Sequence, residues 1–263
     1  MLNRWNKFVK FANIAPQKPR EALERMANVF EVRWDTWRSK RPACAWLSPS
    51  EGEERLMKAL NFDSSAFAME LDEVGDEVDA RVEHLTPNAP IRLSHCAVTS
   101  LARAAYIGCR TRKPSVVVET GVAFGMTSRY ILQALDANGH GRLESVDLPP
   151  LGDEEGFFVG ALVRDDLRTR WTLHRGSTRR ELPPLLDRLG GVEVFVHDSL
   201  HTYRTMRWEF ETVWPYMPQG SLLLSDDIGA NKAFHDFADE VRPTYHWAVC
   251  DDKQNGFFGI IVK

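Results

Sequence analysis

Four side chains able to do chemistry follow two apolar segments in the last third of the chain. Asp198 and His201 come after an apolar run at 192–196, and Asp226 and Asp227 follow another at 221–225. If these runs are neighbouring parallel strands, the four side chains reach one edge of the sheet. Carboxylates gathered without basic partners repel one another unless a cation lies among them, and oxygen ligands favour Mg²⁺, Mn²⁺ or Ca²⁺ over zinc. The alternative is that the acids cap helices and His201 lies on the surface.

His201 could also move a proton. It follows Asp198 by three residues, at the expected start of a helix. The ordinary pKa of an imidazole, about 6.5, suits proton abstraction near neutral pH. We therefore expect His201 to act as a general base.

A glycine-containing turn follows an earlier β-branched run at 115–119. It reads Glu-Thr-Gly-Val-Ala-Phe-Gly and contains Gly121 and Gly125. The dinucleotide pattern GxGxxG is absent, because Glu119 stands where its first glycine would fall; an acid there suits a cationic ligand better than a pyrophosphate. Asp147 lies 28 residues after Glu119 and ends the next predicted strand. A carboxylate at that position can accept hydrogen bonds from a ribose diol. Alternatively, the glycines serve only the turn, and Asp147 caps a helix or faces solvent.

Alternating strands and helices are predicted to position these residues. Helices are expected over 127–137, 180–189, around 206–217 and over 231–241. The predicted strands cover 115–119, 143–147, 171–174, 192–198, 221–226, 245–250 and 257–262, the last two as a hairpin. This alternation predicts an α/β fold with a doubly wound parallel sheet, whose ligands bind beyond the carboxyl ends of the strands.

The first 110 residues have a different texture. Residues 1–40 are mostly helical by pattern and carry a net charge of +5, whereas residues 51–90 carry −8. We expect a mainly helical N-terminal extension over 1–110, acting as a lid, in acceptor recognition or in oligomerisation, and a ligand-binding domain over 111–263. Aromatic side chains in the extension favour a homo-oligomer formed through its helices.

Composition excludes several classes of protein. The chain has 263 residues, 43% of them hydrophobic and 27% charged, which is typical of a globular protein. A net charge of −4 gives no support to nucleic-acid binding. No apolar run is long enough to cross a bilayer, and the beginning of the sequence lacks the layout of a signal peptide. The four cysteines are widely spread, so we expect a cytoplasmic protein without disulfides.

Together, the Glu119–Gly125 turn, Asp147, Asp198 with His201, and the Asp226–Asp227 pair resemble class I S-adenosylmethionine-dependent methyltransferases. The resemblance covers about residues 113–263 and is strongest to the metal-dependent macrolide-sugar O-methyltransferase group. It implies a Rossmann-like, seven-stranded sheet with an antiparallel last strand. It also implies transfer of a methyl group from S-adenosylmethionine to a hydroxyl of a sugar or natural product, assisted by Mg²⁺.

The resemblance also implies roles for individual residues. Glu119, Gly121, Gly125, Ser128 and Asp147 would bind the methionine and ribose parts of the cofactor. The metal would be bound by Asp198, Asp226 and Asp227, and His201 would be the base. One departure concerns the adenine: many relatives have an acid after the glycine that follows the third strand, but here Ser177 stands in its place. We therefore expect Ser177 to belong to the cofactor site, where its hydroxyl, backbone groups or apolar packing would hold the adenine.

Three other functions stay open. A nicotinamide-dependent oxidoreductase has a similar sheet, but Glu119 and the missing GxGxxG pattern argue against it. A methyltransferase that needs no metal would use His201 as base and the acids as structural groups. A non-catalytic, cofactor-binding relative could be a subunit of an assembly, although the presence of both His201 and the acids argues against it.

Overall fold

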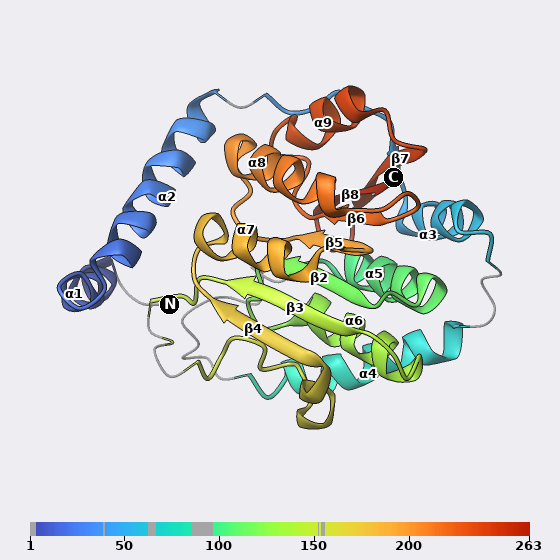
Figure 1. Ribbon diagram of the computed structural model, residues 1–263, viewed down its shortest axis with the longest axis horizontal. Coiled ribbons are helices and arrows are strands. Elements are labelled where there is room, and N and C mark those ends of the chain that lie inside the picture. Colours follow the sequence, from blue (N-terminus) through green and yellow to red (C-terminus); the bar gives the residue numbers. More distant parts are fainter. Residues whose placement is uncertain (1–3, 39, 63–66, 86–96, 152, 154–155) are drawn as a thin grey trace.

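The computed structural model describes residues 4–38, 40–62, 67–85, 97–151, 153 and 156–263. Its centre is one eight-stranded sheet with the order β1-β7-β8-β6-β5-β2-β3-β4 (Figure 1). β8 runs antiparallel to both of its neighbours, and the other adjacent strands are parallel. The prediction of an α/β doubly wound sheet with an antiparallel last strand is confirmed.

Seven strands lie where the sequence patterns predicted them. They are β2 (Val116–Thr120), β3 (Arg142–Asp147), β4 (Trp171–Arg175), β5 (Val194–His197), β6 (Leu222–Ser225), β7 (Tyr245–Asp251) and β8 (Gly256–Val262). The eighth strand, β1 (Trp46–Leu47), was not predicted: it has two residues and pairs with β7 at the sheet edge. Two residues are too few to produce a recognisable alternation of apolar and polar side chains.

Helices cover both faces of the sheet. The α-helices are α1 (Arg4–Ile14), α2 (Pro19–Arg38), α3 (Pro49–Ala59), α4 (Ala68–Val82), α5 (Thr99–Arg112), α6 (Met126–Ala137), α7 (Thr178–Leu189), α8 (Tyr203–Val213) and α9 (Ala233–Val241), and short 3₁₀ helices are η3 (Asp165–Arg170) and η4 (Trp214–Tyr216). α3, α4, α5 and α6 pack on one face, and α7, α8 and α9 pack on the other (Figure 1). Among the described residues, none of these helices is long and apolar enough to cross a bilayer.

The central strands send alternate side chains into two apolar cores. In β5, Val194 and Val196 enter the core beneath α5, whereas Phe195 enters the core beneath α8 and α9. Because both faces are covered, β2 and β5 are buried along their whole length. The carboxyl ends of these rigid strands are therefore well suited to hold functional side chains in place.

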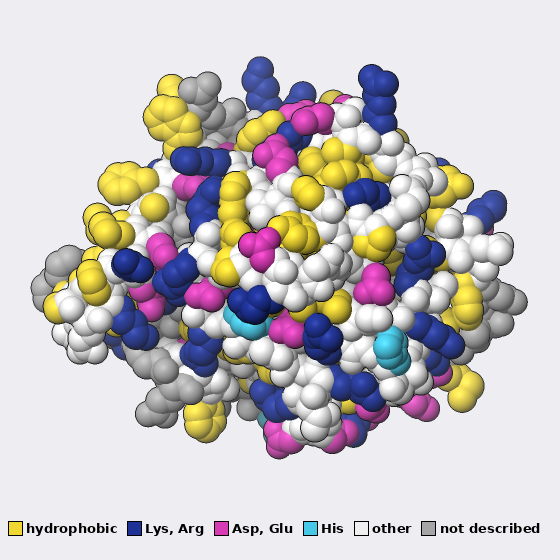
Figure 2. All heavy atoms as spheres, viewed as in Figure 1, with side chains coloured by type: hydrophobic (Ala, Val, Ile, Leu, Met, Phe, Trp, Pro, Cys, Tyr) yellow, Lys and Arg dark blue, Asp and Glu magenta, His cyan; other side chains and the backbone are white. Residues whose placement is uncertain are grey.

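The N-terminal region is mainly helical, as predicted, but α2 packs with an unusual orientation. Its acidic side chains point toward the rest of the chain, and its apolar side chains point outward. The exposed apolar residues of α2 are Leu23, Met26, Val29, Phe30, Val32, Trp34 and Trp37. Figure 2 shows hydrophobic side chains along the left edge of the molecule, the edge that α2 forms in Figure 1. The predicted division at residue 110 and the predicted homo-oligomer stay predictions.

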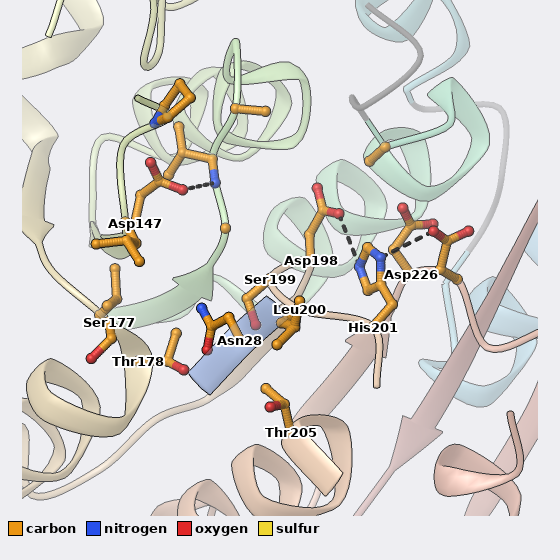
Figure 3. Close-up of a pocket in the computed structure, with 18 of the residues that line it drawn as sticks. Asn28, Asp147, Ser177, Thr178, Asp198, Ser199, Leu200, His201, Thr205 and Asp226 are labelled. Atoms are coloured by element: carbon orange, nitrogen blue, oxygen red, sulfur yellow. Dashed lines mark hydrogen bonds and ion pairs between the residues drawn. The ribbon is translucent and has the colours of Figure 1, made fainter. Parts of the chain in front are cut away.

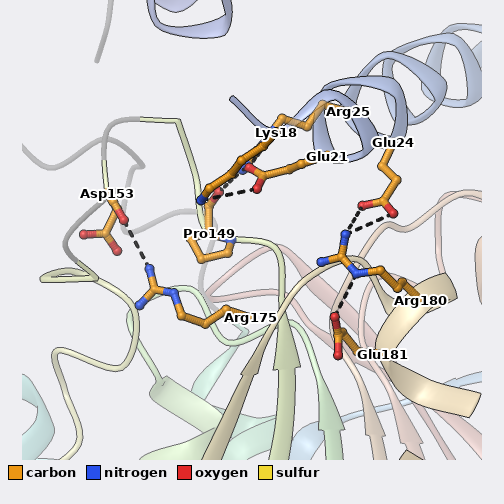
Figure 4. Close-up of polar contacts among 9 residues, drawn as sticks. All are labelled: Lys18, Glu21, Glu24, Arg25, Pro149, Asp153, Arg175, Arg180 and Glu181. Atoms are coloured by element: carbon orange, nitrogen blue, oxygen red, sulfur yellow. Dashed lines mark hydrogen bonds and ion pairs between the residues drawn. The ribbon is translucent and has the colours of Figure 1, made fainter. Parts of the chain in front are cut away.

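Polar contacts hold α2 against the sheet edge (Figure 4). The Arg25 guanidinium donates to Glu21 Oε1 at 2.7 Å and to the carbonyl oxygen of Pro149 at 2.6 Å. Arg180 of α7 forms an ion pair with Glu24 at 3.2 Å. α2 is thus fastened to the loop after β3 and to α7, two of the segments that border the site described next.

Candidate active site

The turn after β2 requires glycine at two positions. Gly121 has φ +81°, and a Cβ placed there would lie 1.9 Å from the carbonyl oxygen of Asp198. Gly125 has φ +86°, and its Cβ would lie 2.9 Å from the Cα of Gly160. These positive φ angles and close approaches exclude other side chains. The turn consequently lies directly against the loop after β5, which carries Asp198.

A cavity of about 1080 Å³ opens at the carboxyl ends of the strands. Asp147, at the end of β3, lines it together with Ser177 and Thr178 at the start of α7. Asp198 and His201 line a separate part of its wall (Figure 3). The rule that ligands bind beyond the carboxyl ends of parallel strands therefore correctly placed the cavity.

Two polar side chains at one end of the cavity have unsatisfied atoms. Asp147 Oδ1 accepts a hydrogen bond from the Val122 backbone N–H at 3.2 Å, whereas Oδ2 is buried and has no partner among the described residues. The Ser177 hydroxyl is likewise buried, and the part of the chain that the structure describes offers it no hydrogen-bond partner. Burial raises the pKa of Asp147 to about 6, opposed by the Val122 hydrogen bond. Buried polar atoms normally find partners, so these two indicate a polar ligand at this end.

The opposite end of the cavity gathers acids around one imidazole. His201 Nε2 lies 3.5 Å from Asp198 Oδ1, and its Nδ1 lies 3.0 Å from Asp227 Oδ2. Asp198, His201 and Asp226 each offer one ligand atom, and these three atoms all lie within 4.8 Å of one another. Asp227 is outside that group of three and contacts the other side of the imidazole.

The electrostatics of this end favour a cation. Burial and the nearby Asp198 carboxylate raise the pKa of Asp226 well above its ordinary value. Burial opposes protonation of His201, but the Asp198 and Asp227 carboxylates on either side of the ring outweigh it and raise the pKa of His201 well above 6.5. Asp226 Oδ1 is buried, and no described residue forms a hydrogen bond with it. Two carboxylates and an imidazole form a suitable ligand set for a divalent metal.

Three of the predicted site residues lie outside the lining of this cavity. Glu119 is only 1% exposed, and its Oε2 accepts hydrogen bonds from the Ser128 and Ser145 hydroxyls, each at 2.7 Å. Burial raises the pKa of Glu119 to about 8. Gly125 shapes the turn, as described above. The structure therefore brings Gly121, Asp147, Ser177, Asp198, His201, Asp226 and Asp227 to the cavity, but not Glu119, Gly125 or Ser128.

A buried acid beneath the site escaped the sequence reasoning. Glu209 of α8 is completely buried and accepts hydrogen bonds from Thr120 at 2.6 Å and from Ser199 at 2.7 Å. Its Oε2 also lies 2.7 Å from His197 Nδ1. Glu209 thereby ties the ends of β2 and β5 together. Its place on the apolar face of α8, beside Phe210, is a signal that could have revealed it.

Residues of α2 and α8 that line the cavity were also missed. Asn28 and Glu31 come from α2, more than 100 residues before Arg204 of α8. Glu31 accepts hydrogen bonds from the Thr202 hydroxyl and, at 2.6 Å, from the Thr205 hydroxyl. These contacts depend on how α2 docks, which local sequence patterns do not reveal.

Comparison with known families identifies the central part of the chain. Residues 118–228 match the family model described as a methyltransferase domain. This part of the chain is similar to methyltransferase domains, and the match covers less than half of the 263 residues. The matched residues extend from β2 to just beyond Asp227 and include both ends of the cavity. No curated protein matches the sequence of the chain.

Solved structures share the fold of this chain. One is the O-methyltransferase TomG from Streptomyces achromogenes, involved in tomaymycin synthesis and solved with S-adenosylmethionine: identity is 14%, coverage is 81% of this chain and 96% of TomG, and the TM-score is 0.51. Another is the methyltransferase PaMTH1 from Podospora anserina, solved with S-adenosylhomocysteine. Its sequence identity to this chain is 12%, the alignment covers 84% of this chain and 100% of PaMTH1, and the TM-score is 0.51. At these identities the likeness shows the fold alone.

Proposed function

We propose that this protein is a class I S-adenosylmethionine-dependent methyltransferase, which transfers the methyl group of S-adenosylmethionine to a hydroxyl of a small molecule of sugar or natural-product type. The observation that carries the proposal is the division of one cavity into two chemically different ends. One end has unsatisfied hydrogen-bonding groups at Asp147 and Ser177, and the other has the Asp198, His201 and Asp226 cluster. The O-methyltransferase activity named for TomG agrees with this proposal.

The Asp147 end suits the nucleoside part of the cofactor. Asp147 Oδ2 can accept hydrogen bonds from a ribose diol, and the Ser177 hydroxyl can bind an adenine nitrogen. Gly121 leaves the backbone of the turn open to the methionine part. Ser128 and Glu119 support that turn from below, through the hydrogen bond between them.

The acidic end suits the hydroxylated acceptor. Asp198 and Asp226 would hold a divalent metal, with Asp227 as a third ligand, so that His201 stays available as the base; Mg²⁺ is the ion we propose. When bound, such a metal lowers the pKa of an acceptor hydroxyl and offsets the charge of the acids. Two chelating oxygens, as in a vicinal diol or a catechol, suit this arrangement.

Proton transfer is assigned to His201. Asp227 lies 3.0 Å from its Nδ1 and can orient the ring, with Nε2 on the side of Asp198. A cation held by Asp198 and Asp226 would offset the carboxylates that raise the pKa of His201, so that Nε2 could receive the acceptor proton. The walls of the cavity hold the two reactants in line, and this alignment supplies a large part of the rate. A metal-independent enzyme would retain the His201 step, whereas a non-catalytic relative would bind the cofactor without turnover.

Isothermal titration with S-adenosylhomocysteine, in Mg²⁺ and again in EDTA, tests the proposal. We expect micromolar or tighter binding, with heat or affinity that depends on the metal. Binding that is identical in EDTA, together with methyl transfer in EDTA, would favour the metal-independent enzyme. Absence of binding to folded protein in both conditions would refute the methyltransferase function.

A further inference from the structure

A second cavity of about 860 Å³ adjoins the acidic end of the first. The two cavities share Ala27 and Glu31 of α2 and Arg204 of α8 in their walls. Asn231 lines the second cavity, and its amide donates to the carbonyl oxygen of His201 at 3.2 Å. The second cavity is therefore placed to hold the part of an acceptor that extends away from the reacting hydroxyl.

The acids of the second cavity are engaged by the protein itself. Asp35 accepts a hydrogen bond from the Tyr203 backbone N–H at 3.0 Å, and Asp236 accepts one from the Tyr203 hydroxyl at 3.0 Å. Glu31 accepts hydrogen bonds from two threonine hydroxyls and lies 3.9 Å from the Arg179 guanidinium. Each carboxylate thus already has a protein donor.

The cationic side chains that line the second cavity form no ion pair with the carboxylates of the described residues. Arg204, Lys40 and Lys232 all line it and are exposed. Within the described residues, none of the three has a carboxylate oxygen within 4.0 Å. Their N–H donors remain available to a ligand, and Arg204 offers them at the junction of the two cavities.

Aromatic side chains provide an apolar wall beside these cations. Phe30 and Trp34 of α2 line the cavity and are 66% and 62% exposed. Side chains so exposed gain free energy when a flat apolar group covers them. An apolar wall beside free cations matches a ligand with a ring system and an anionic group.

We propose that the second cavity binds an acceptor that has a flat apolar body and a negatively charged group, such as a carboxylate, sulfonate or phosphate. Arg204 binds the anionic group, supported by Lys40 and Lys232, while Phe30 and Trp34 pack on the body. The proposal rests on the proposed O-methyltransferase function, for which it names the class of acceptor. It makes Arg204 and Trp34 specificity-determining residues.

A pair of fluorescent dyes tests this recognition with the full chain. 8-Anilinonaphthalene-1-sulfonate is the anionic probe, and N-phenyl-1-naphthylamine has the same rings without the sulfonate. Arg204→Ala should raise the Kd of the sulfonate by about threefold to tenfold and leave the Kd of the neutral dye within about twofold, because one charge-assisted contact is lost. The difference should shrink at about 0.5 M NaCl, because the cations are exposed.

Two further variants locate the dye. Arg33→Ala is the matched control, since Arg33 is an exposed arginine of α2 that lines neither cavity; both Kd values should stay unchanged. Trp34→Ala removes part of the apolar wall and should weaken both dyes. Circular dichroism confirms that each variant is folded.

The proposal is overturned if Arg204→Ala leaves the sulfonate Kd unchanged, if it weakens both dyes equally, or if Arg33→Ala has the same effect. An unchanged Kd for both dyes in Trp34→Ala would also overturn it. Failure of the proposed function is measured separately, by titration with S-adenosylhomocysteine. Loss of the dye preference with intact cofactor binding would remove only the acceptor class.

Discussion

Substitution of Glu119 by glutamine separates a structural role of this acid from a cofactor-binding role. The carboxyl is completely buried, and burial raises its pKa from 4.5 to about 8. Its folded-state pKa is higher than its unfolded-state pKa, so the folded protein binds the proton more tightly. The stabilising contribution is complete below about pH 4.5 and is lost as the pH rises through about 8.

The magnitude follows from the width of that interval. Between 4.5 and about 8, each pH unit removes about 1.4 kcal/mol from the free energy of unfolding of the wild-type protein. The loss attributable to Glu119 between pH 5 and pH 9 is therefore about 4 kcal/mol. Glu119→Gln is neutral at every pH and can still accept the hydrogen bonds that Ser128 and Ser145 donate.

Urea unfolding at a series of pH values measures the effect. We expect Glu119→Gln to abolish most of this decline, so that its advantage over the wild type grows as the pH rises from 5 to 9. Glu211→Gln, an exposed glutamate of α8, is the matched control and should keep the wild-type dependence. Titration with S-adenosylhomocysteine should give a Kd within about threefold of the wild type, because Glu119 does not line the cavity.

Two results would refute this reasoning. A Glu119→Gln variant whose stability follows the wild-type pH dependence would show that the buried carboxyl does not titrate as its burial requires. A loss of cofactor affinity of about tenfold or more, in a protein of unchanged stability, would instead favour the role implied by the family resemblance, in which Glu119 recognises the α-amino group.

Further substitutions test the two ends of the cavity. Asp147→Ala should weaken binding of S-adenosylhomocysteine by about tenfold to a hundredfold in calorimetry, because a charged acceptor of the ribose hydroxyls is lost. Asp198→Ala and Asp226→Ala should abolish turnover and leave cofactor binding nearly intact; equal loss of cofactor binding in both would indicate a structural role. His201→Ala should reduce turnover by about 10²–10⁴-fold, and a change of less than a few-fold would remove it from the mechanism. Gly121→Ala should destabilise the protein by at least about 2 kcal/mol in urea unfolding, because its Cβ would overlap a backbone carbonyl.

The central strands of the sheet could be predicted because they are buried on both faces. A short apolar run such as 194–196 is recognisable without any knowledge of its neighbours, and the polar residue after it marks the carboxyl end. The parallel arrangement then brings Asp198 and Asp226 together, although 28 residues separate them in the sequence. Local pattern and topology rules together were therefore sufficient for this half of the site.

The packing of α2 could not be predicted by the same logic. Amphipathic helices normally turn their apolar side inward. In α2, Glu24, Glu31 and Asp35 point inward instead, because they form ion pairs or hydrogen bonds with residues of α7 and α8. Those partners lie more than 100 residues away in the sequence, and the periodicity of α2 does not indicate them. The part of the cavity walls that α2 contributes could consequently not be predicted from the sequence.

The buried acids at the acidic end of the cavity lower the free energy of unfolding of the protein. Asp226 is buried beside Asp198, its Oδ1 has no hydrogen-bond partner within the described ranges, and its pKa is raised well above the ordinary value. Folding alone would favour an asparagine there, since an amide has no charge to bury. Asp226→Asn should accordingly raise the Tm of the protein measured in EDTA by a few degrees while abolishing turnover. A substitution that stabilises the protein and removes its activity is expected when a buried charge serves a ligand rather than the fold. A lower Tm would instead show that Asp226 supports the structure.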